Sequence, residues 1–252
     1  MPRLPRTDLA RLYHLNSSNF RPILPDLSLD HDRHPQRFRT YAGSARIALP
    51  GRDHEIQVPL GEAIRRRASL RDFSGAELPL AKLGRLLYNS YGVTGTLSVD
   101  GETTAKRPVP SAGALYPLEL YIATQNVEGL EDAIYHYDAR DHELELRRTG
   151  LFQDQLSKMT LGQDMIRTAN LVIFVAAIAE RTMWKYGQRG YRYVFLDAGH
   201  LGQNLYLTAT ALDLSIAGIG GFFDREVNEL CLLPPGEEVI YLLCGGVTGA
   251  PR

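Results

Sequence analysis

The sequence contains little cysteine and no excess of either charge. Cys231 and Cys244 are the only cysteines among 252 residues, and neither belongs to a CxxC pair, so no disulfide framework is expected. The 28 basic and 29 acidic side chains give a formal net charge of -1. A dedicated nucleic-acid-binding protein carries a basic excess that displaces counterions from phosphates. These two shortages argue against a disulfide scaffold and against a nucleic-acid-binding protein.

Long apolar runs are missing as well. The most apolar stretch, LVIFVAAIA at 171–179, is much too short to cross a bilayer. The first residues lack the apolar core of a signal peptide. We therefore expect a soluble, cytoplasmic protein.

Several common catalytic and metal-binding motifs are absent. The sequence contains no HExxH, GxSxG or GxxxxGK[ST] pattern, so the usual signals of metalloproteases, α/β-hydrolases and P-loop NTPases are missing. His31 and His34 have a spacing that could ligate a metal on a helix. Pro35 next to them and the absence of a nearby third ligand favour a solvated pair, so no metal site is expected.

The chain divides into a proline-rich beginning and a region of regular elements. Residues 1–55 contain repeated prolines and few periodic apolar positions, which predicts an extended N-terminal arm. Residues 56–252 form the predicted domain. Apolar periodicity there predicts helices at 59–67, 78–92, 193–213 and 224–231, strands at 118–124, 171–178, 214–219 and 238–246, and a hairpin at 133–148. Helices and strands are mixed without regular βαβ alternation, which predicts an α+β fold.

One short segment has the composition of a phosphate clamp. RRRASLRDF at 65–73 places Arg67, Ser69 and Arg71 at alternating positions just after a predicted helix. In an extended segment these side chains project to the same side. Two guanidiniums and a hydroxyl suit phosphate oxygens. The alternative is a basic helix end that offsets the helix dipole.

In two further segments, small residues and glycines would let a ligand approach the backbone closely. RPVPSAGALYPLE at 107–119 combines two prolines, which fix the chain, with a sterically minimal Ser-Ala-Gly core that a flat ring could approach. AGIGGFFD at 217–224 follows a predicted strand, but a dinucleotide fingerprint needs glycine where Phe223 stands. We reject a Rossmann site. Ordinary loop or turn chemistry is the alternative for both segments.

WKYGQRGYRY at 184–193 concentrates aromatic and cationic side chains in ten positions. A nucleic-acid stacking surface, a solvated loop and an active-site wall all predict that density. The near-neutral net charge argues against the first of these.

These segments, in this order, resemble the flavin-dependent nitroreductase superfamily. The resemblance implies a three-layer fold with a central, mostly antiparallel sheet flanked by helices, and an intertwined homodimer built around the helix at 193–213. It implies that FMN is the cofactor. The FMN contacts that it implies are Arg67, Ser69 and Arg71 at the phosphate, Pro110, Ser111, Ala112, Gly113 and Leu115 beside the flavin ring, Ile219, Gly220 and Gly221 at the N5 and O4 edge, and the final residue, Arg252.

A closer resemblance is to the SagB-type dehydrogenase branch, which includes the azoline oxidases of thiazole- and oxazole-modified microcins. Ordinary nitroreductases carry a Ser-x-x-Asn-x-Gln-Pro type of loop, whereas this chain has Ala114 and Tyr116 at the corresponding positions. RASLRDFSG, YHYD and RTMWKYGQRGYRY are also similar to that branch. The resemblance implies that Lys185 and Tyr186 form the catalytic pair that removes a proton from an azoline ring.

A lysine can act as that base if burial and nearby cations lower its pKa. Arg181, Arg189 and Arg192 are the cations expected near Lys185. The resemblance further implies a heterocyclic or peptide-derived substrate, oxygen as the flavin oxidant and cyclodehydratase partner proteins. An NAD(P)H-dependent nitro- or quinone reductase and a non-catalytic flavin-fold scaffold in a peptide-modifying complex are the alternatives.

Overall fold

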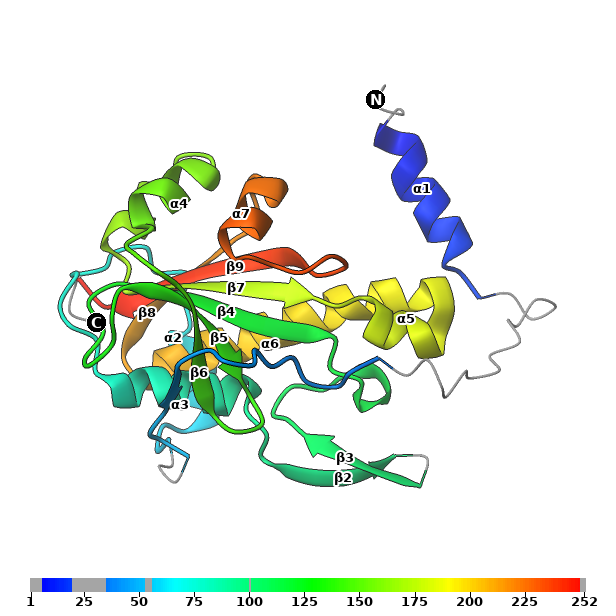
Figure 1. Ribbon diagram of the computed structural model, residues 1–252, viewed down its shortest axis with the longest axis horizontal. Coiled ribbons are helices and arrows are strands. Elements are labelled where there is room, and N and C mark those ends of the chain that lie inside the picture. The colour runs from blue at the N-terminus through cyan, green and yellow to red at the C-terminus, as the bar shows by residue number, and fades with distance from the viewer. Residues whose placement is uncertain (1–5, 20–34, 53–55, 100, 250–252) are drawn as a thin grey trace.

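A mixed layer of strands and helices forms the body of the protein. The computed structural model describes residues 6–19, 35–52, 56–99 and 101–249. The strands of the main sheet are β1 (Arg46–Ala48), β4 (Leu118–Thr124), β5 (Ala133–Asp138), β6 (Glu143–Thr149), β7 (Leu171–Ala177), β8 (Leu214–Ile219) and β9 (Glu238–Val247). They form one seven-stranded sheet in the order β1-β6-β5-β4-β7-β9-β8 (Figure 1). Each pair of neighbouring strands is antiparallel.

Helices cover both faces of this sheet. The larger helices are α1 (Arg6–Asn16), α2 (Leu60–Arg66), α3 (Leu80–Tyr91), α4 (Gln153–Met159), α5 (Glu180–Tyr186), α6 (Gly190–Ala211) and α7 (Asp224–Leu230). Helices α2, α3 and α6 lie on one face, and α4 and α7 lie on the other (Figure 1). Helix α5 leads through a short turn at Gly187–Arg189 into α6. Helix α1 projects from the body, and its Leu12 side chain is exposed.

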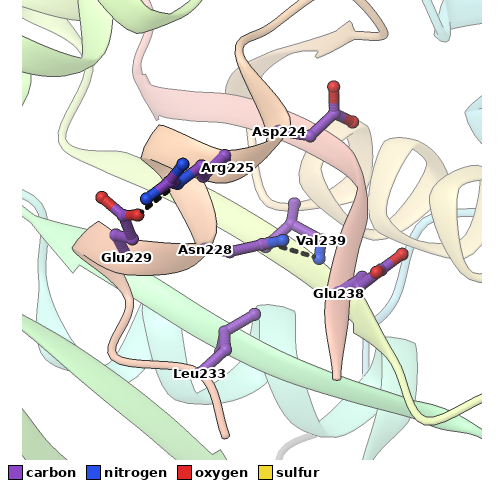
Figure 2. Close-up of a pocket in the computed structure, with 7 residues that line it drawn as sticks. All are labelled: Asp224, Arg225, Asn228, Glu229, Leu233, Glu238 and Val239. Carbon is purple, nitrogen blue, oxygen red and sulfur yellow. Dashed lines mark hydrogen bonds and ion pairs between the residues drawn. The ribbon is translucent and has the colours of Figure 1, made fainter. Parts of the chain in front are cut away.

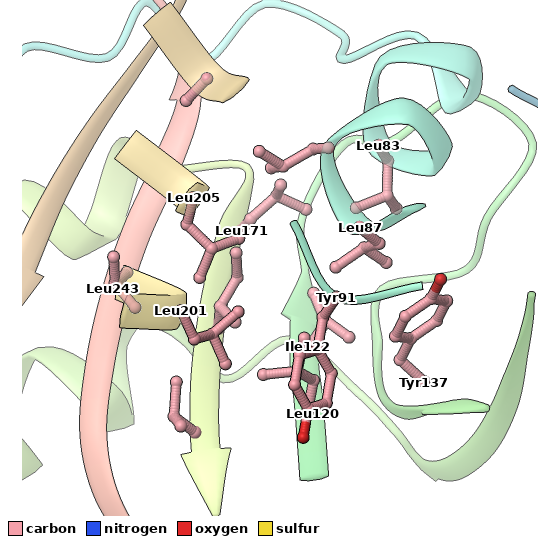
Figure 3. Packing of buried hydrophobic residues seen from close by; sticks show 14 of the residues in the cluster. Leu83, Leu87, Tyr91, Leu120, Ile122, Tyr137, Leu171, Leu201, Leu205 and Leu243 are labelled. Atoms are coloured by element: carbon pink, nitrogen blue, oxygen red, sulfur yellow. The ribbon is translucent and has the colours of Figure 1, made fainter. Parts of the chain in front are cut away.

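The strands in the middle of the sheet are buried on both sides because each face has its own core. Successive side chains of a strand point to opposite faces. In β4, Leu120 and Ile122 join the core under α3 and α6, whereas Tyr121 and Ala123 join the core under α4 and α7. Figure 3 shows the first of these cores, where Leu83 and Leu87 of α3 approach the sheet. This two-sided burial explains why LVIFVAA of β7 is apolar at every position.

The predicted fold class is confirmed, because a mostly antiparallel sheet flanked by helices makes an α+β structure. The predicted α2, α3, α6 and α7 are present, as are the predicted strands β4 to β9. The prediction of an extended arm is wrong for Arg6–Asn16, which form α1. Further along, β1 pairs with β6, so this part of the arm completes the edge of the sheet.

Sequence patterns also missed the short elements. A separate two-stranded hairpin, β2 (Gly95–Val99) and β3 (Glu102–Lys106), was not predicted. The helices α4 and α5 were not predicted either. His31 and His34 lie outside the described residues. Among the residues that are described, no helix is long and apolar enough to span a bilayer.

Candidate active site

The predicted phosphate clamp lies against the second half of α6. The Ser69 hydroxyl lies 3.0 Å from the Tyr206 hydroxyl, and the Arg67 guanidinium lies 5.6 Å from the centre of the Tyr206 ring. Both side chains therefore face α6, as their alternating positions predict. Within the described parts of the chain, Arg67 and Arg71 form no ion pair with a carboxylate. Two uncompensated guanidiniums beside a hydroxyl are a donor set that suits a phosphate dianion.

The glycine turn after β8 is joined to this clamp through Tyr206. The Tyr206 hydroxyl accepts a 2.6 Å hydrogen bond from the Gly218 N–H. Ile219 is buried at the end of β8, and the exposed Gly220 and Gly221 follow it. A Cβ atom on Gly220 would have no described atom within 4 Å. The backbone of Gly220 therefore borders open space into which a ligand could reach.

A strained turn of residues 111–116, called the site turn from here on, holds the predicted ring-binding segment. Gly113, Ala114 and Tyr116 have φ values of 61°, 52° and 45°. The left-handed region is unfavourable for residues other than glycine and persists only where the surroundings hold it. The Ser111 hydroxyl donates a 2.5 Å hydrogen bond to Oδ2 of Asp197 and accepts a 2.9 Å hydrogen bond from the Tyr116 N–H. These bonds fix the turn against the first half of α6.

The site turn also meets the predicted catalytic pair. A Cβ atom on Gly113 would lie 2.8 Å from the Tyr186 hydroxyl and 3.5 Å from Cδ of Lys185. Lys185 and Tyr186 are half-buried in the last turn of α5. The Tyr186 ring packs edge-on against Tyr193, with 5.1 Å between the ring centres. The structure thus brings together two predicted segments that are about 70 residues apart in the sequence.

An open cavity lies over the site turn. Its volume is about 540 Å³, and the β2–β3 hairpin forms part of its wall. The lining residues are Leu97, Val99, Lys106, Arg107, Pro108, Val109, Pro110, Ser111, Gly113, Ala114 and Tyr116. Small residues and prolines on one side leave room for a flat ligand.

The arginines at the end of the aromatic stretch hold α1. Arg192 Nε donates a 2.6 Å hydrogen bond to the Ser17 hydroxyl, and Arg189 Nη1 donates a 3.1 Å bond to the Ser17 carbonyl. The ring of Tyr191 packs edge-on against Tyr13 of α1. Part of the aromatic and cationic density at 184–193 is therefore explained by helix docking.

Arg181 belongs to a buried network of charges behind the site turn. Its Nη2 lies 2.6 Å from Oε1 of Glu119, and its Nη1 donates to the Tyr116 carbonyl at 3.3 Å. Glu119 Oε2 lies 3.1 Å from His136 Nε2, and His136 Nδ1 lies 2.8 Å from Glu145. Burial would raise the pKa of Glu119, but the charge of Arg181 and the hydrogen bond with His136 lower it to about 2. Arg181 is therefore charge-compensated and supports the site turn.

Sequence patterns missed Asp197 and Tyr206 as residues of the site, and they did not predict that Arg181 pairs with Glu119. Burial raises the pKa of Asp197 to about 6, while the Ser111 hydrogen bond, the charge of His200 and the Ala112 N–H oppose that change. The available signal for Asp197 was an acidic residue inside a helix that is apolar almost all round. Arg252 lies outside the described residues.

A second cavity of about 470 Å³ lies between α7 and β9 (Figure 2). Two of its polar side chains are held by hydrogen bonds within the cavity wall. Arg225 Nε lies 2.7 Å from Glu229, and the Asn228 side-chain oxygen accepts a 2.9 Å bond from the Val239 N–H. None of the predicted site residues lines this cavity, so we assign it no part in the site.

Comparison with known proteins decides the family. The profile of the Nitroreductase family matches residues 64–247. The chain belongs to the nitroreductase family. This nitroreductase-family chain is 35% identical over 199 residues to MJ1384 of Methanocaldococcus jannaschii, which is named as a nitroreductase, and the match covers 73% of this chain and 97% of that protein.

Other relatives of this family member carry names from peptide processing. The microcin B17-processing protein McbC of Escherichia coli is 28% identical over 61% of this chain and 56% of its own length. The trifolitoxin-processing protein TfxB of Rhizobium leguminosarum bv. trifolii is 31% identical over 52% of this chain and 36% of its own length. The chain thus matches nearly all of MJ1384, but only about half of McbC and a third of TfxB.

Solved structures agree with the family assignment. A nitroreductase structure from Anabaena variabilis has a TM-score of 0.77 and 29% identity, covering 100% of this chain and 49% of that one. A chain of the Escherichia coli microcin synthetase McbBCD complex has a TM-score of 0.65 at 21% identity, covering 96% and 93%. The second likeness establishes a shared fold.

Proposed function

We propose that this nitroreductase-family protein is an FMN-dependent dehydrogenase that oxidises azoline rings in a peptide-derived or other heterocyclic substrate. The observation that carries the proposal is the contact of Gly113 with Lys185 and Tyr186. It supports the proposal, because Lys185 is the candidate base and the family resemblance assigns the site turn to the flavin ring. The names of McbC and TfxB, both peptide-processing proteins, support the substrate class.

The residues present fit FMN. Arg67, Ser69 and Arg71 supply charged and neutral donors for a phosphate, and no described carboxylate competes for the two guanidiniums. The open space beside Gly220 suits close approach of a ring to the backbone. When bound, FMN supplies an acceptor for a hydride equivalent.

The chain itself must handle the proton. Conversion of an azoline to an azole removes a proton from one ring carbon and a hydride equivalent from its neighbour. Lys185, as the neutral amine, accepts the proton. The Tyr186 hydroxyl lies beside Gly113, as Lys185 does, and it orients the lysine or relays the proton. Oxygen is the proposed final electron acceptor.

We also propose that two chains form an intertwined homodimer with flavins at the interface. Phe195 and Leu196 of α6 are 46% and 57% exposed, and Leu60 and Ile64 of α2 are 67% and 54% exposed. So many large apolar side chains on neighbouring helices would be costly to leave in water. Cyclodehydratase proteins are the proposed further partners, because a chain of the McbBCD complex shares the fold.

The experiment compares Lys185→Ala and Tyr186→Phe with the parent protein. Reduction of bound flavin by a thiazoline-containing peptide is followed without oxygen, so that reoxidation does not mask the step. Loss of a positioned base costs about 10²–10⁴-fold in rate, and Tyr186→Phe should cost less if the phenol only relays the proton. Lys158→Ala, an exposed lysine on α4, is the matched control. If Lys185→Ala reduces its flavin as fast as the parent, the proposed role of Lys185 is wrong.

The relationship to MJ1384 favours a second candidate, an NAD(P)H-dependent nitro- or quinone reductase. Such an enzyme would need no base at Lys185. Steady oxidation of NADPH with a quinone acceptor, unchanged in Lys185→Ala, would identify it.

A further inference from the structure

Asp197 occupies a position where a carboxylate is costly. It has 4% of its surface exposed. Val194, Ala198 and Leu201 beside it on α6 belong to the apolar core. A buried charge persists only where hydrogen bonds compensate for the lost water. The partners of Asp197 therefore indicate what it does.

Its partners belong to the site turn. The Ser111 hydroxyl donates to Oδ2 of Asp197 at 2.5 Å, and the Ala112 N–H lies close enough to this carboxylate to lower its pKa. The same Ser111 oxygen accepts the Tyr116 N–H at 2.9 Å. One carboxylate thus holds the start of the turn directly and its end through Ser111.

The turn depends on an anchor outside itself. Gly113, Ala114 and Tyr116 all have left-handed φ values, and two of them are not glycine. Within the turn, the Ala114 N–H bonds to the Ser111 carbonyl at 3.0 Å and the Leu115 N–H bonds to the Ala112 carbonyl at 3.3 Å. Two such local bonds do not offset the preference of these residues for other conformations. A relaxed turn would move the Gly113 backbone away from Lys185 and Tyr186.

The geometry points to Asp197 as a positioning residue, whose carboxylate holds the site turn so that Gly113 keeps its place against Lys185 and Tyr186. The predicted effect on reaction rate rests on the proposed function. The effect on the turn itself is independent of that function, because it follows from hydrogen bonds within the chain.

The charge of Asp197 gives this role a pH dependence. The groups that face it are the Ser111 hydroxyl and the Ala112 N–H from the turn, Tyr91 from α3, and His200 one turn further along α6. Burial raises its pKa to about 6. The ionised carboxylate accepts stronger hydrogen bonds than the neutral acid, so the anchor tightens as the pH rises through this value.

The first test uses the flavin-free protein and amide hydrogen exchange. Asp197→Asn keeps the shape of the side chain but removes its charge, and Ser111→Ala removes the bridging hydroxyl. We expect faster exchange of the Ala112 and Tyr116 amides in both variants. Asp154→Asn, at an exposed acid of α4, should leave these amides unchanged. Parent-like protection of the turn in Asp197→Asn and Ser111→Ala would overturn the inference.

The second test uses the flavin-loaded enzyme. We expect Asp197→Asn to lower the maximal rate of flavin reduction by about 10²-fold with little change in KM, because small displacements of reacting groups have effects of that size. The parent rate should rise through a midpoint near the Asp197 pKa of about 6, and this limb should vanish in Asp197→Asn. The double variant with Ser111→Ala should be no slower than the worse single variant. An unchanged rate and pH profile would overturn the inference.

Measurements of folding stability distinguish a positioning role of Asp197 from a merely structural one. A carboxyl group whose pKa is raised in the folded protein stabilises it below the unfolded value of 3.8 and loses that contribution as the pH rises through about 6. The Asp197→Asn variant does not lose stability in this way as the pH rises. It should therefore resist denaturant better than the parent at about pH 8 and equally well at about pH 4. A slower but more stable variant is the expected result. If the parent itself reduces no flavin, the proposed function fails, while the exchange comparison still decides the role of Asp197.

Discussion

Replacement of Gly113 by alanine tests the arrangement of the site from the structure alone. Gly113 has a φ of 61°, and a Cβ atom there would lie 2.8 Å from the Tyr186 hydroxyl. A left-handed alanine costs about 1–2 kcal/mol in folding stability. The contact adds little to that cost, because the phenol is at the end of a flexible side chain and can move by up to about 1 Å to an ordinary contact distance.

The effect on activity should be much larger than the effect on stability. Displacement of a reacting group by about 1 Å can cost about 10²-fold in rate, so we expect Gly113→Ala to slow flavin reduction by about that factor. Gly129→Ala is the matched control, since Gly129 has a φ of 68° in an exposed turn with no described atom within 4 Å of its Cβ position. Both variants should lose similar stability in denaturant titrations, but only Gly113→Ala should lose activity.

A double variant identifies the atom responsible. Tyr186→Phe removes the hydroxyl that the new methyl group would meet, so Gly113→Ala should add little further loss in that background. Parent-like activity of Gly113→Ala, or an equal loss in Gly129→Ala, would refute the contact between the site turn and the catalytic pair.

Three further results are expected. Arg67→Ala and Arg71→Ala should each weaken FMN binding by about 1.5–3 kcal/mol through loss of a charge-assisted phosphate contact; unchanged FMN affinity in both would move the clamp elsewhere. Phe195→Asp should convert a homodimer to monomers in light scattering whereas Leu232→Asp, at another exposed apolar side chain, should not; a parent monomer that keeps one FMN per chain would exclude a shared site. Burial would lower the pKa of His136, but its two carboxylate partners raise it to about 9 from 6.5, so its contribution to stability is complete below about pH 6.5 and is lost as the pH rises through about 9. Urea titrations at several pH values should show this loss in the parent and not in His136→Gln. The same pH dependence of stability in the two proteins would contradict a charged His136 between its two carboxylates.

Local patterns predicted the parts of the site that depend on local geometry. Alternation along an extended segment was enough to place Arg67 and Ser69 on one side. Composition was enough to identify 110–113 as a proline-fixed segment of small residues, but it did not predict the turn with left-handed φ values at Ala114 and Tyr116.

What the sequence could not predict depends on contacts between distant segments. Asp197 gains its role from Ser111, which lies 86 residues away in the sequence. Arg181 looked like one of several cations near Lys185, but its charge is compensated by Glu119 on the neighbouring β4. Helix α1 has a weak apolar pattern and is held at its end by Arg189 and Arg192, so no local signal distinguished it from an extended arm.

The most direct test of the proposed function is a comparison of two electron donors for the bound flavin. The purified protein, loaded with FMN and kept free of oxygen, is mixed with a thiazoline-containing peptide or with NADPH, and the flavin spectrum is followed. Dehydrogenation of an azoline predicts that the peptide reduces the flavin and appears as a thiazole product two hydrogens lighter, and that Lys185→Ala blocks this reaction. Flavin that stays oxidised with the peptide but is reduced rapidly by NADPH would contradict azoline oxidation and support the reductase.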